Sequence, residues 1–141
     1  MKLLNKKTDY AIRALLVLAE KKDSFLSVRE VSKNQNIPYQ FLRRILQELI
    51  KNKLVDSREG GKGGFKISKN PDLINLVDVI KIFQGNIQLV ECMFRKQLCG
   101  NRKTCVLRRE IKKIERIVDE KFKGISIAKL LKSSKTNKLR R

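Results

Sequence analysis

The chain has 141 residues, of which 41% are hydrophobic, so one globular domain with a buried core is expected. Lys and Arg number 34 against 14 Asp and Glu, and the net charge of +20 indicates a polyanionic partner. The absence of histidine excludes His-based acid–base catalysis and His-rich zinc sites. The longest apolar run, residues 14–19, is far shorter than the roughly 20 residues of a membrane span, so no membrane partner is expected.

Neither phosphate-binding loop pattern, GxxxxGK[ST] or GxGxxG, occurs in the sequence, and the glycine-rich run 60–64 fits neither. An enzyme is therefore disfavoured. Asp9 and Arg13 interrupt any signal-peptide core near the N-terminus, which predicts a cytoplasmic protein whose thiols stay reduced.

The first three predicted elements are helices. Apolar residues at helical spacing predict a helix over residues 5–22. Ser27 and Glu30 form a capping box that opens a second helix, which continues to about Gln35. Pro38 then breaks the chain and favours the start of a third helix over residues 39–52.

The third helix has two contrasting faces. An apolar stripe predicts the buried face, and truncation of Leu42 or Leu46 to Ala should cost about 2–5 kcal/mol. The opposite face carries Gln40, Arg43, Arg44, Gln47 and Lys51. Amide and basic groups of this kind read base edges and phosphates in a major groove. The alternative is an ordinary solvated helix face.

A β-hairpin follows, with strands near residues 54–58 and 65–68 joined by the glycines of 60–64. Helix, turn, helix and hairpin together predict a winged helix-turn-helix, in which Arg58 and Lys62 contact the DNA backbone or minor groove. The remaining predicted DNA contacts are Ser27, Arg29 and Tyr39, although Tyr39 is equally suited to packing.

The C-terminal half begins with a helix over residues 76–84, capped by Asn75 and ended by Gly85. The predicted divisions are a DNA-binding domain (1–85), a cysteine loop (86–105), a dimerisation helix with a short return helix (106–132) and a basic disordered tail (133–141). The near-heptad apolar spacing of the long helix predicts a homodimer, on the positions Leu107, Ile111, Ile114, Val118 and Phe122.

All three cysteines, Cys92, Cys99 and Cys105, fall in the loop with the spacing C-x6-C-x5-C. An odd number of clustered cysteines in a reducing compartment indicates metal or redox chemistry and not a disulfide framework. An iron–sulfur cluster, a zinc site and a thiol switch are all compatible with three thiols, and so is an incidental cluster without a role.

Several motifs resemble the family of winged-helix regulators that includes IscR, NsrR and CymR. They are the opening segment 6–19, the helix within 37–49, the wing 60–65 and the segment 76–80 that leads to Gly85. The resemblance covers roughly residues 1–131. It implies a mainly α fold with a small β-hairpin wing and a long C-terminal dimerisation helix. It also implies a homodimer that binds palindromic double-stranded DNA operators.

In cluster-bearing members of that family, three cysteines in this segment hold an iron–sulfur cluster, so the resemblance assigns Cys92, Cys99 and Cys105 as ligands. The first cysteine gap is six residues instead of the usual five, and the usual histidine ligand is replaced by Arg108. Asp9 matches the partner-subunit carboxylate of NsrR-like members; a surface ion pair with Lys6 or Arg13 is the alternative. Either a 2Fe–2S or a 4Fe–4S cluster suits this ligand set.

The sequence thus predicts a repressor whose DNA affinity is controlled by the iron–sulfur cluster. A first alternative is a cluster-free winged-helix regulator that responds to zinc, thiol redox, a metabolite or a partner. A second is a non-specific basic nucleic-acid-binding protein, for which the net charge alone would suffice.

Overall fold

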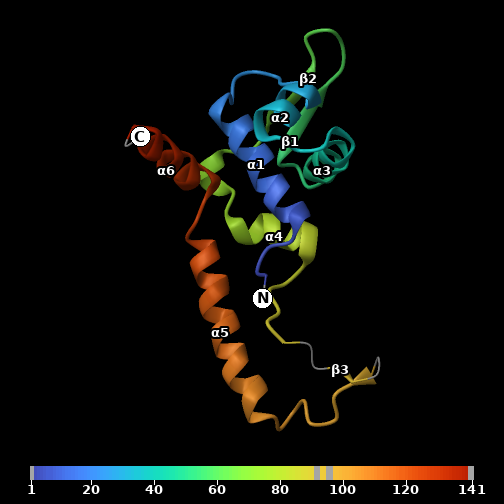
Figure 1. The fold of residues 1–141 in the computed structure, drawn as a ribbon, viewed down its shortest axis with the longest axis vertical. Coiled ribbons are helices and arrows are strands. Elements are labelled where there is room, and N and C mark those ends of the chain that lie inside the picture. The colour runs from blue at the N-terminus through green and yellow to red at the C-terminus, as the bar shows by residue number, and fades with distance from the viewer. Residues whose placement is uncertain (1, 91–92, 95–96, 140–141) are drawn as a thin grey trace.

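The computed structural model describes residues 2–90, 93–94 and 97–139, and it is mainly helical with a small β-hairpin, as predicted (Figure 1). The helices are α1 (Lys6–Glu20), α2 (Val28–Gln35), α3 (Tyr39–Lys51), the short 3-10 helix η1 (Pro71–Leu73), α4 (Leu76–Gln84), α5 (Val106–Lys123) and α6 (Ile127–Leu139). The strands are β1 (Val55–Arg58), β2 (Gly64–Ile67), β3 (Met93–Phe94) and β4 (Gln97–Leu98). The β3–β4 pair was not predicted.

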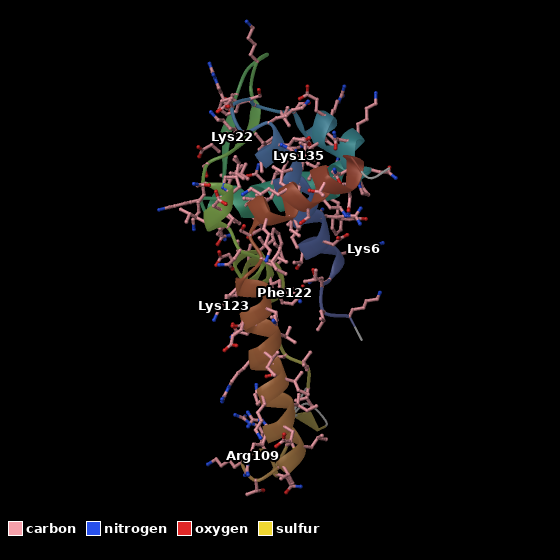
Figure 2. All side chains as sticks on the ribbon, turned by 90° about the vertical axis from the view of Figure 1, so that its left-hand side faces the viewer. Lys6, Lys22, Arg109, Phe122, Lys123 and Lys135 are labelled. Atoms are coloured by element: carbon pink, nitrogen blue, oxygen red, sulfur yellow. The ribbon has the colours of Figure 1, made fainter. Side chains whose placement is uncertain are left out.

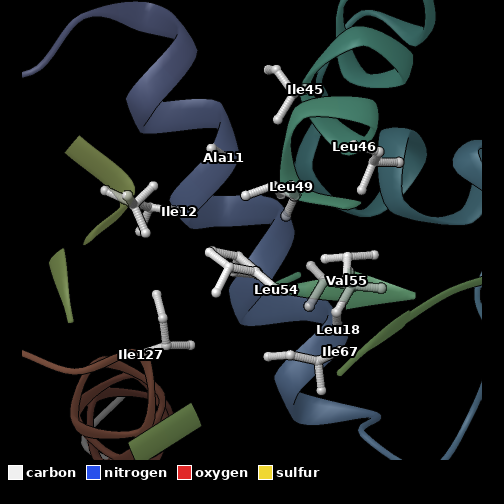
Figure 3. Packing of buried hydrophobic residues seen from close by; sticks show 14 of the residues in the cluster. Ala11, Ile12, Leu18, Ile45, Leu46, Leu49, Leu54, Val55, Ile67 and Ile127 are labelled. Carbon is white, nitrogen blue, oxygen red and sulfur yellow. The ribbon is translucent and has the colours of Figure 1, made fainter. Parts of the chain in front are cut away.

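Helix α1 forms the centre of the core, between α3 and the wing on one side and α4 and α6 on the other (Figure 1). Its buried residues include Ala11 and Leu18, which pack with α3 and with both strands of the wing (Figure 3). The apolar stripe predicted for α3 is buried as expected, at Leu42, Ile45, Leu46 and Leu49.

Strands β1 and β2 pair antiparallel, with Val55 opposite Ile67 and Arg58 opposite Gly64. The wing is tied to the body by an isolated bridge, in which Leu26 and Phe65 exchange backbone hydrogen bonds of 2.8 and 2.7 Å. Leu26, which lies between α1 and α2, therefore pairs with β2 at the edge of the hairpin. This pairing fixes the wing relative to α2.

A second bridge joins the start of α4 to the turn between α5 and α6. The Leu76 N–H donates to the Ile125 carbonyl at 2.9 Å, and the Ile127 N–H donates to the Ile74 carbonyl at 2.8 Å. Ile127 is fully buried in the core (Figure 3). This bridge attaches the turn that follows the C-terminal end of α5 to the winged-helix body.

The prediction of a disordered tail over residues 133–141 is wrong as far as residue 139, and residues 140–141 lie outside the described residues. The prediction that a short helix folds back on the dimerisation helix is also wrong. Helix α6 continues to Leu139 and packs against α1 and η1. Ile127, Leu130 and Leu131 bury its first turns against the core, and a packed first turn supplies the nucleus on which a helix extends. The excess of basic residues over 129–141, from which disorder was predicted, is compatible with a helix whose residues 133–137 are exposed to solvent.

Helix α5 projects from the body, and residues 99–105 lead from β4 into the end of α5 that is farthest from the body (Figure 1). Phe122, near its C-terminal end, packs on the core, whereas Val106, Leu107, Ile114 and Ile117 are 50–69% exposed. Among the described residues, no helix is long and apolar enough to span a bilayer.

Candidate functional site

The turn between α2 and α3 is held by local hydrogen bonds that the sequence specifies. The Ser27 hydroxyl accepts the Glu30 N–H at 3.1 Å, and the Glu30 carboxylate accepts the Ser27 N–H at 2.6 Å. Helix α2 ends at Asn36, which adopts a left-handed conformation, and the Ser32 hydroxyl donates to the Ile37 carbonyl. Pro38 then precedes the first residue of α3. This arrangement fixes the direction in which α3 leaves α2.

The outward face of α3 carries every predicted DNA-contacting residue of that helix in an exposed position. Gln40, Arg44, Gln47 and Lys51 recur at helical spacing and form a continuous polar ridge, with Arg43 beside it. Tyr39, at the first turn, is 40% exposed. The buried apolar stripe on the opposite side holds this ridge outward, in the geometry by which a recognition helix enters a major groove.

The wing and the start of α2 flank this ridge. Arg29, Arg58 and Lys62 are exposed, and Ser27 is half-buried because its hydroxyl caps α2. The Arg58 guanidinium lies 5.6 Å from the ring centre of Phe25, and the Lys66 ammonium lies at the same distance. Phe25 was not among the predicted site residues, since only the fold brings the loop between α1 and α2 next to the wing.

A hollow of about 480 Å³ is lined by residues of α3, α4 and the start of α1. Arg44 and Gln47 line it on the α3 side, together with Glu48, and its apolar wall is formed by Phe41, Ile82 and Phe83. Helix α4 leads into the cysteine segment. A shift of α4 would therefore change the shape of this hollow, which lies beside the outward ridge of α3.

The two cysteines that the structure describes, Cys99 and Cys105, lie at the two ends of a short segment of turns. Two successive turns connect them, in which Arg102 N–H donates to the Cys99 carbonyl and Thr104 N–H donates to the Asn101 carbonyl. Both thiols are free and half-buried. Cys105 caps α5, and its sulfur accepts the Arg108 N–H at 3.4 Å. Cys92 lies outside the described residues.

The donor chemistry of this segment fits a soft metal or an iron–sulfur cluster, because Cys thiolates are the soft ligands that hold both. Within residues 2–90, 93–94 and 97–139, no three metal-ligating side chains are gathered in one place. Arg108, at the position where the resemblance places a histidine, cannot ligate iron.

Two tethers fix the ends of the segment that leads to the cysteines. Gln84, at the end of α4, accepts the hydroxyl of buried Thr8 at 2.7 Å and donates to the Leu3 carbonyl at 2.9 Å. Further along, the Glu115 carboxylate accepts the Leu89 N–H at 2.8 Å. The first tether joins α4 to the start of α1, and the second joins the segment to the middle of α5.

Asp9 follows Thr8 on α1 and is ion-paired with Arg13 at 3.2 Å, with its side chain 42% exposed. The surface ion pair that was the alternative reading is therefore present within the protomer. Helix α1 and strand β3 lie well apart in both views of the ribbon (Figures 1 and 2). Within the described part of one protomer, Asp9 does not form a group with Cys99 and Cys105 that could hold a metal ion.

Comparison with known proteins identifies the family of this chain. The family model of Rrf2, described as an iron-dependent transcriptional regulator, matches residues 4–133. The chain belongs to the Rrf2 family. It is 31% identical over 124 residues to an HTH-type transcriptional regulator of Aquifex aeolicus, a match that covers 86% of each protein. It is 38% identical over 101 residues to the regulator NsrR of Halalkalibacterium halodurans, covering 71% of this chain and 66% of NsrR.

Solved structures with the same fold include T. potens IscR, with a TM-score of 0.76, 21% identity and coverage of 95% of this chain and 88% of that one. CymR of B. subtilis has a TM-score of 0.75 and 23% identity, with coverage of 94% and 98%. The family match and the relatives show that this chain is a DNA-binding transcription regulator and not an enzyme. The winged-helix fold and the resemblance stated from the sequence are confirmed.

Proposed function

We propose that this Rrf2 regulator is a homodimeric repressor that reads operator DNA with α3 and the wing. Its DNA affinity is controlled by an iron–sulfur cluster held by Cys92, Cys99 and Cys105. The observation that carries the DNA part of the proposal is the exposed ridge Gln40, Arg44, Gln47 and Lys51, held outward by the buried stripe on the same helix. In this reading Arg58, stacked on Phe25, and Lys62 contact the adjacent backbone.

The path from the cysteines to the DNA face supports regulation of one by the other. Helix α4 contacts α1, which in turn contacts α3, and the Thr8–Gln84 hydrogen bond anchors the last turn of α4. Two states of the cysteine segment would each favour a different position of α4. A different position of α4 would change the spacing of the two recognition helices in a dimer. When bound, an iron–sulfur cluster supplies a redox-active and ligand-reactive centre.

Anaerobic purification, followed by absorption spectroscopy and by iron and acid-labile sulfide assays, tests the cluster assignment. A brown protein with stoichiometric iron and sulfide is expected, and the ratio distinguishes 2Fe–2S from 4Fe–4S. Cys92→Ala, Cys99→Ala and Cys105→Ala should each lose most of the iron, because each removes one thiolate. Full iron and sulfide in these variants would overturn the assignment.

The fourth ligand is proposed to be Asp9 of the partner subunit, since α1 of the same protomer lies away from strand β3. Iron ligation would require Asp9 to release its ion pair with Arg13. Asp9→Ala should change the visible spectrum of the cluster or its reactivity with nitric oxide. Arg13→Ala is the matched control, because it breaks the same ion pair but removes no oxygen ligand. An unchanged spectrum and reactivity in Asp9→Ala would remove Asp9 from the site.

Selection of binding sequences from a random duplex library tests operator recognition. A homodimer with two equivalent recognition helices should enrich a palindromic motif, with half-sites about one helical turn apart. Gln47→Ala should weaken binding to that motif by about 1–3 kcal/mol and relax selection at one base pair of each half-site. Enrichment of no motif, with affinity that falls steeply with salt, would favour the non-specific nucleic-acid-binding alternative.

A cluster-free thiol or zinc switch is the second candidate, supported by the two free, half-buried thiols of Cys99 and Cys105. An oxidised form of CymR from Staphylococcus aureus shares the fold, with a TM-score of 0.73. A colourless protein without sulfide after reconstitution, whose DNA binding responds to zinc or to thiol oxidation, would favour this candidate.

A further inference from the structure

A hollow of about 270 Å³ lies along the first half of α5, at the opposite end of the molecule from α3 and the wing (Figure 1). Cys105 and seven Lys or Arg residues line it. No acidic side chain from the described part of the chain contributes to its lining. Seven cations around one concavity repel one another unless counter-charges are supplied.

Ion pairs with carboxylates of the same helix neutralise only part of this positive charge. Lys112 pairs with Glu115 and Lys113 pairs with Glu110, each at 2.8 Å. For Arg102, Arg109 and Arg116, none of the carboxylates among the described residues lies within 4.0 Å. The hollow therefore holds a net positive charge that its own side chains do not neutralise.

Arg108 provides an independent indication of a missing acceptor. Its Nε is buried and has no hydrogen-bond partner among the described residues, and its other contact is a long 3.4 Å bond from Nη1 to the Arg102 carbonyl. A buried donor without an acceptor is disfavoured, and a bound water or ion is one partner that satisfies such a donor in folded proteins. An anion in the hollow would supply that acceptor.

We propose that this hollow binds a multiply charged anion of the phosphate class. Guanidinium groups bind phosphate through paired hydrogen bonds, and Arg102, Arg108, Arg109 and Arg116 all line the same concavity. Its volume suits a small phosphorylated ligand or one phosphodiester segment of a nucleic acid. The free ligand and the nucleic acid share this chemistry, and the experiment separates them.

The position of Cys105 in the same lining gives the site a regulatory consequence, which rests on the proposed cluster function. A cluster held by thiolates places negative charge at Cys105, beside the bound anion. The two would repel each other, so the cluster and the anion each lower the affinity for the other by the same factor. Anion binding to the cluster-free protein does not depend on that assignment.

Calorimetric titration with pyrophosphate tests the site, with the full chain, reduced cysteines, no iron and an ionic strength kept constant with sodium chloride. The variant R109Q/R116Q should bind at least about tenfold more weakly than wild type, since two charge-assisted contacts are lost. The control K22Q/K135Q removes the same charge at the other end of the molecule, where Figure 2 shows both lysines, and should bind like wild type.

Equal pyrophosphate affinity in the wild type, R109Q/R116Q and K22Q/K135Q, or no heat beyond that of chloride, would overturn the proposal. A parallel titration with duplex DNA that lacks the operator identifies the source of the phosphate. A DNA salt slope that falls by about 1.8 in R109Q/R116Q indicates a nucleic-acid backbone at the site. An unchanged slope, with weakened pyrophosphate binding, indicates a free phosphorylated ligand.

Discussion

Glu115 shows at the scale of one residue how a buried charge organises the cysteine segment. It is 6% exposed, the one charged residue that is buried in the described part of the chain. Burial alone would raise its pKa, but hydrogen bonds from Lys112 and the Leu89 N–H, with the charges of Lys112 and Arg108, outweigh burial and hold the pKa below its usual value. The carboxylate therefore stays ionised and keeps the segment attached to α5.

Replacement of this carboxylate should destabilise the protein in a pH-dependent manner. Glu115→Ala leaves the Leu89 N–H and the Lys112 ammonium without their acceptor, and should cost about 1–3 kcal/mol at pH 7. Because the folded pKa is lowered, the ionised carboxylate contributes its stability in full above the unfolded pKa of about 4.3. That contribution is lost as the pH falls through the folded value.

Urea unfolding of Glu115→Ala, Glu115→Gln and the wild type between pH 7 and pH 3 measures both effects. Glu115→Gln keeps an oxygen that can accept the Leu89 N–H but removes the charge, so it should be less harmful than Glu115→Ala and should lack the acid-linked loss. A wild type and a Glu115→Gln variant with parallel stability curves over this range would contradict the assignment.

At the scale of the element, the wing depends on one glycine. Gly64 has φ of +139°, and a Cβ there would lie 2.4 Å from the Leu26 carbonyl oxygen. This close approach is the backbone bridge between Leu26 and Phe65 that fixes the wing to the body. A side chain at this position would both strain the backbone and separate the two strands.

Gly64→Ala should therefore destabilise the protein by about 1–3 kcal/mol and weaken operator binding, since the strained conformation is retained and the bridge is disturbed. Gly61→Ala is the matched control, because a Cβ at Gly61 meets no atom within 4 Å. Thermal unfolding and operator titration of the two variants test this. Equal melting temperatures for Gly64→Ala and Gly61→Ala would show that the close approach does not matter.

At the scale of the whole molecule, α5 presents an apolar face that the described part of the protomer leaves exposed. Leu107, Ile114 and Ile117 are 50–65% exposed and share one side of the helix, whereas Phe122 packs on the core. Such a face on a long projecting helix is typical of a dimer contact. The proposed dimer would place two recognition helices on one operator and bring the partner's α1 within reach of the cysteine segment.

Ile114→Glu should convert the dimer to a monomer, because it places a charge at the centre of the apolar face. Operator affinity should then fall by about 10²-fold or more, since the second half-site contact is no longer linked to the first. Glu120 is exposed on the same helix, and the control variant Glu120→Ala should remain dimeric. Sedimentation velocity and operator titration measure the two effects; a dimeric Ile114→Glu would refute the assignment of this face.

Much of the winged-helix architecture was predictable from the sequence because its signals are local. The capping boxes at Ser27 and Asn75 and the apolar stripe of α3 each lie within one element, where side-chain spacing and hydrogen bonds over three residues determine the outcome. The exposed ridge of α3 followed from the same periodicity. The cysteine spacing marked a candidate metal segment, although it could not supply the fourth ligand.

Contacts between distant residues were decided only by the tertiary structure. The Thr8–Gln84 bond, the Leu89–Glu115 bond and the stack of Arg58 on Phe25 join segments that no local pattern relates. Helix α6 is the clearest case: its alanine, leucines and lysines favour a helix, but a short helix is marginal on its own, and burial of Ile127 in the core beside α1 stabilises it. The sequence by itself thus determined the elements of the winged-helix domain and their chemical faces. Long-range packing decided which of those faces meet, because the free energy of burial is gained only when separate elements come together.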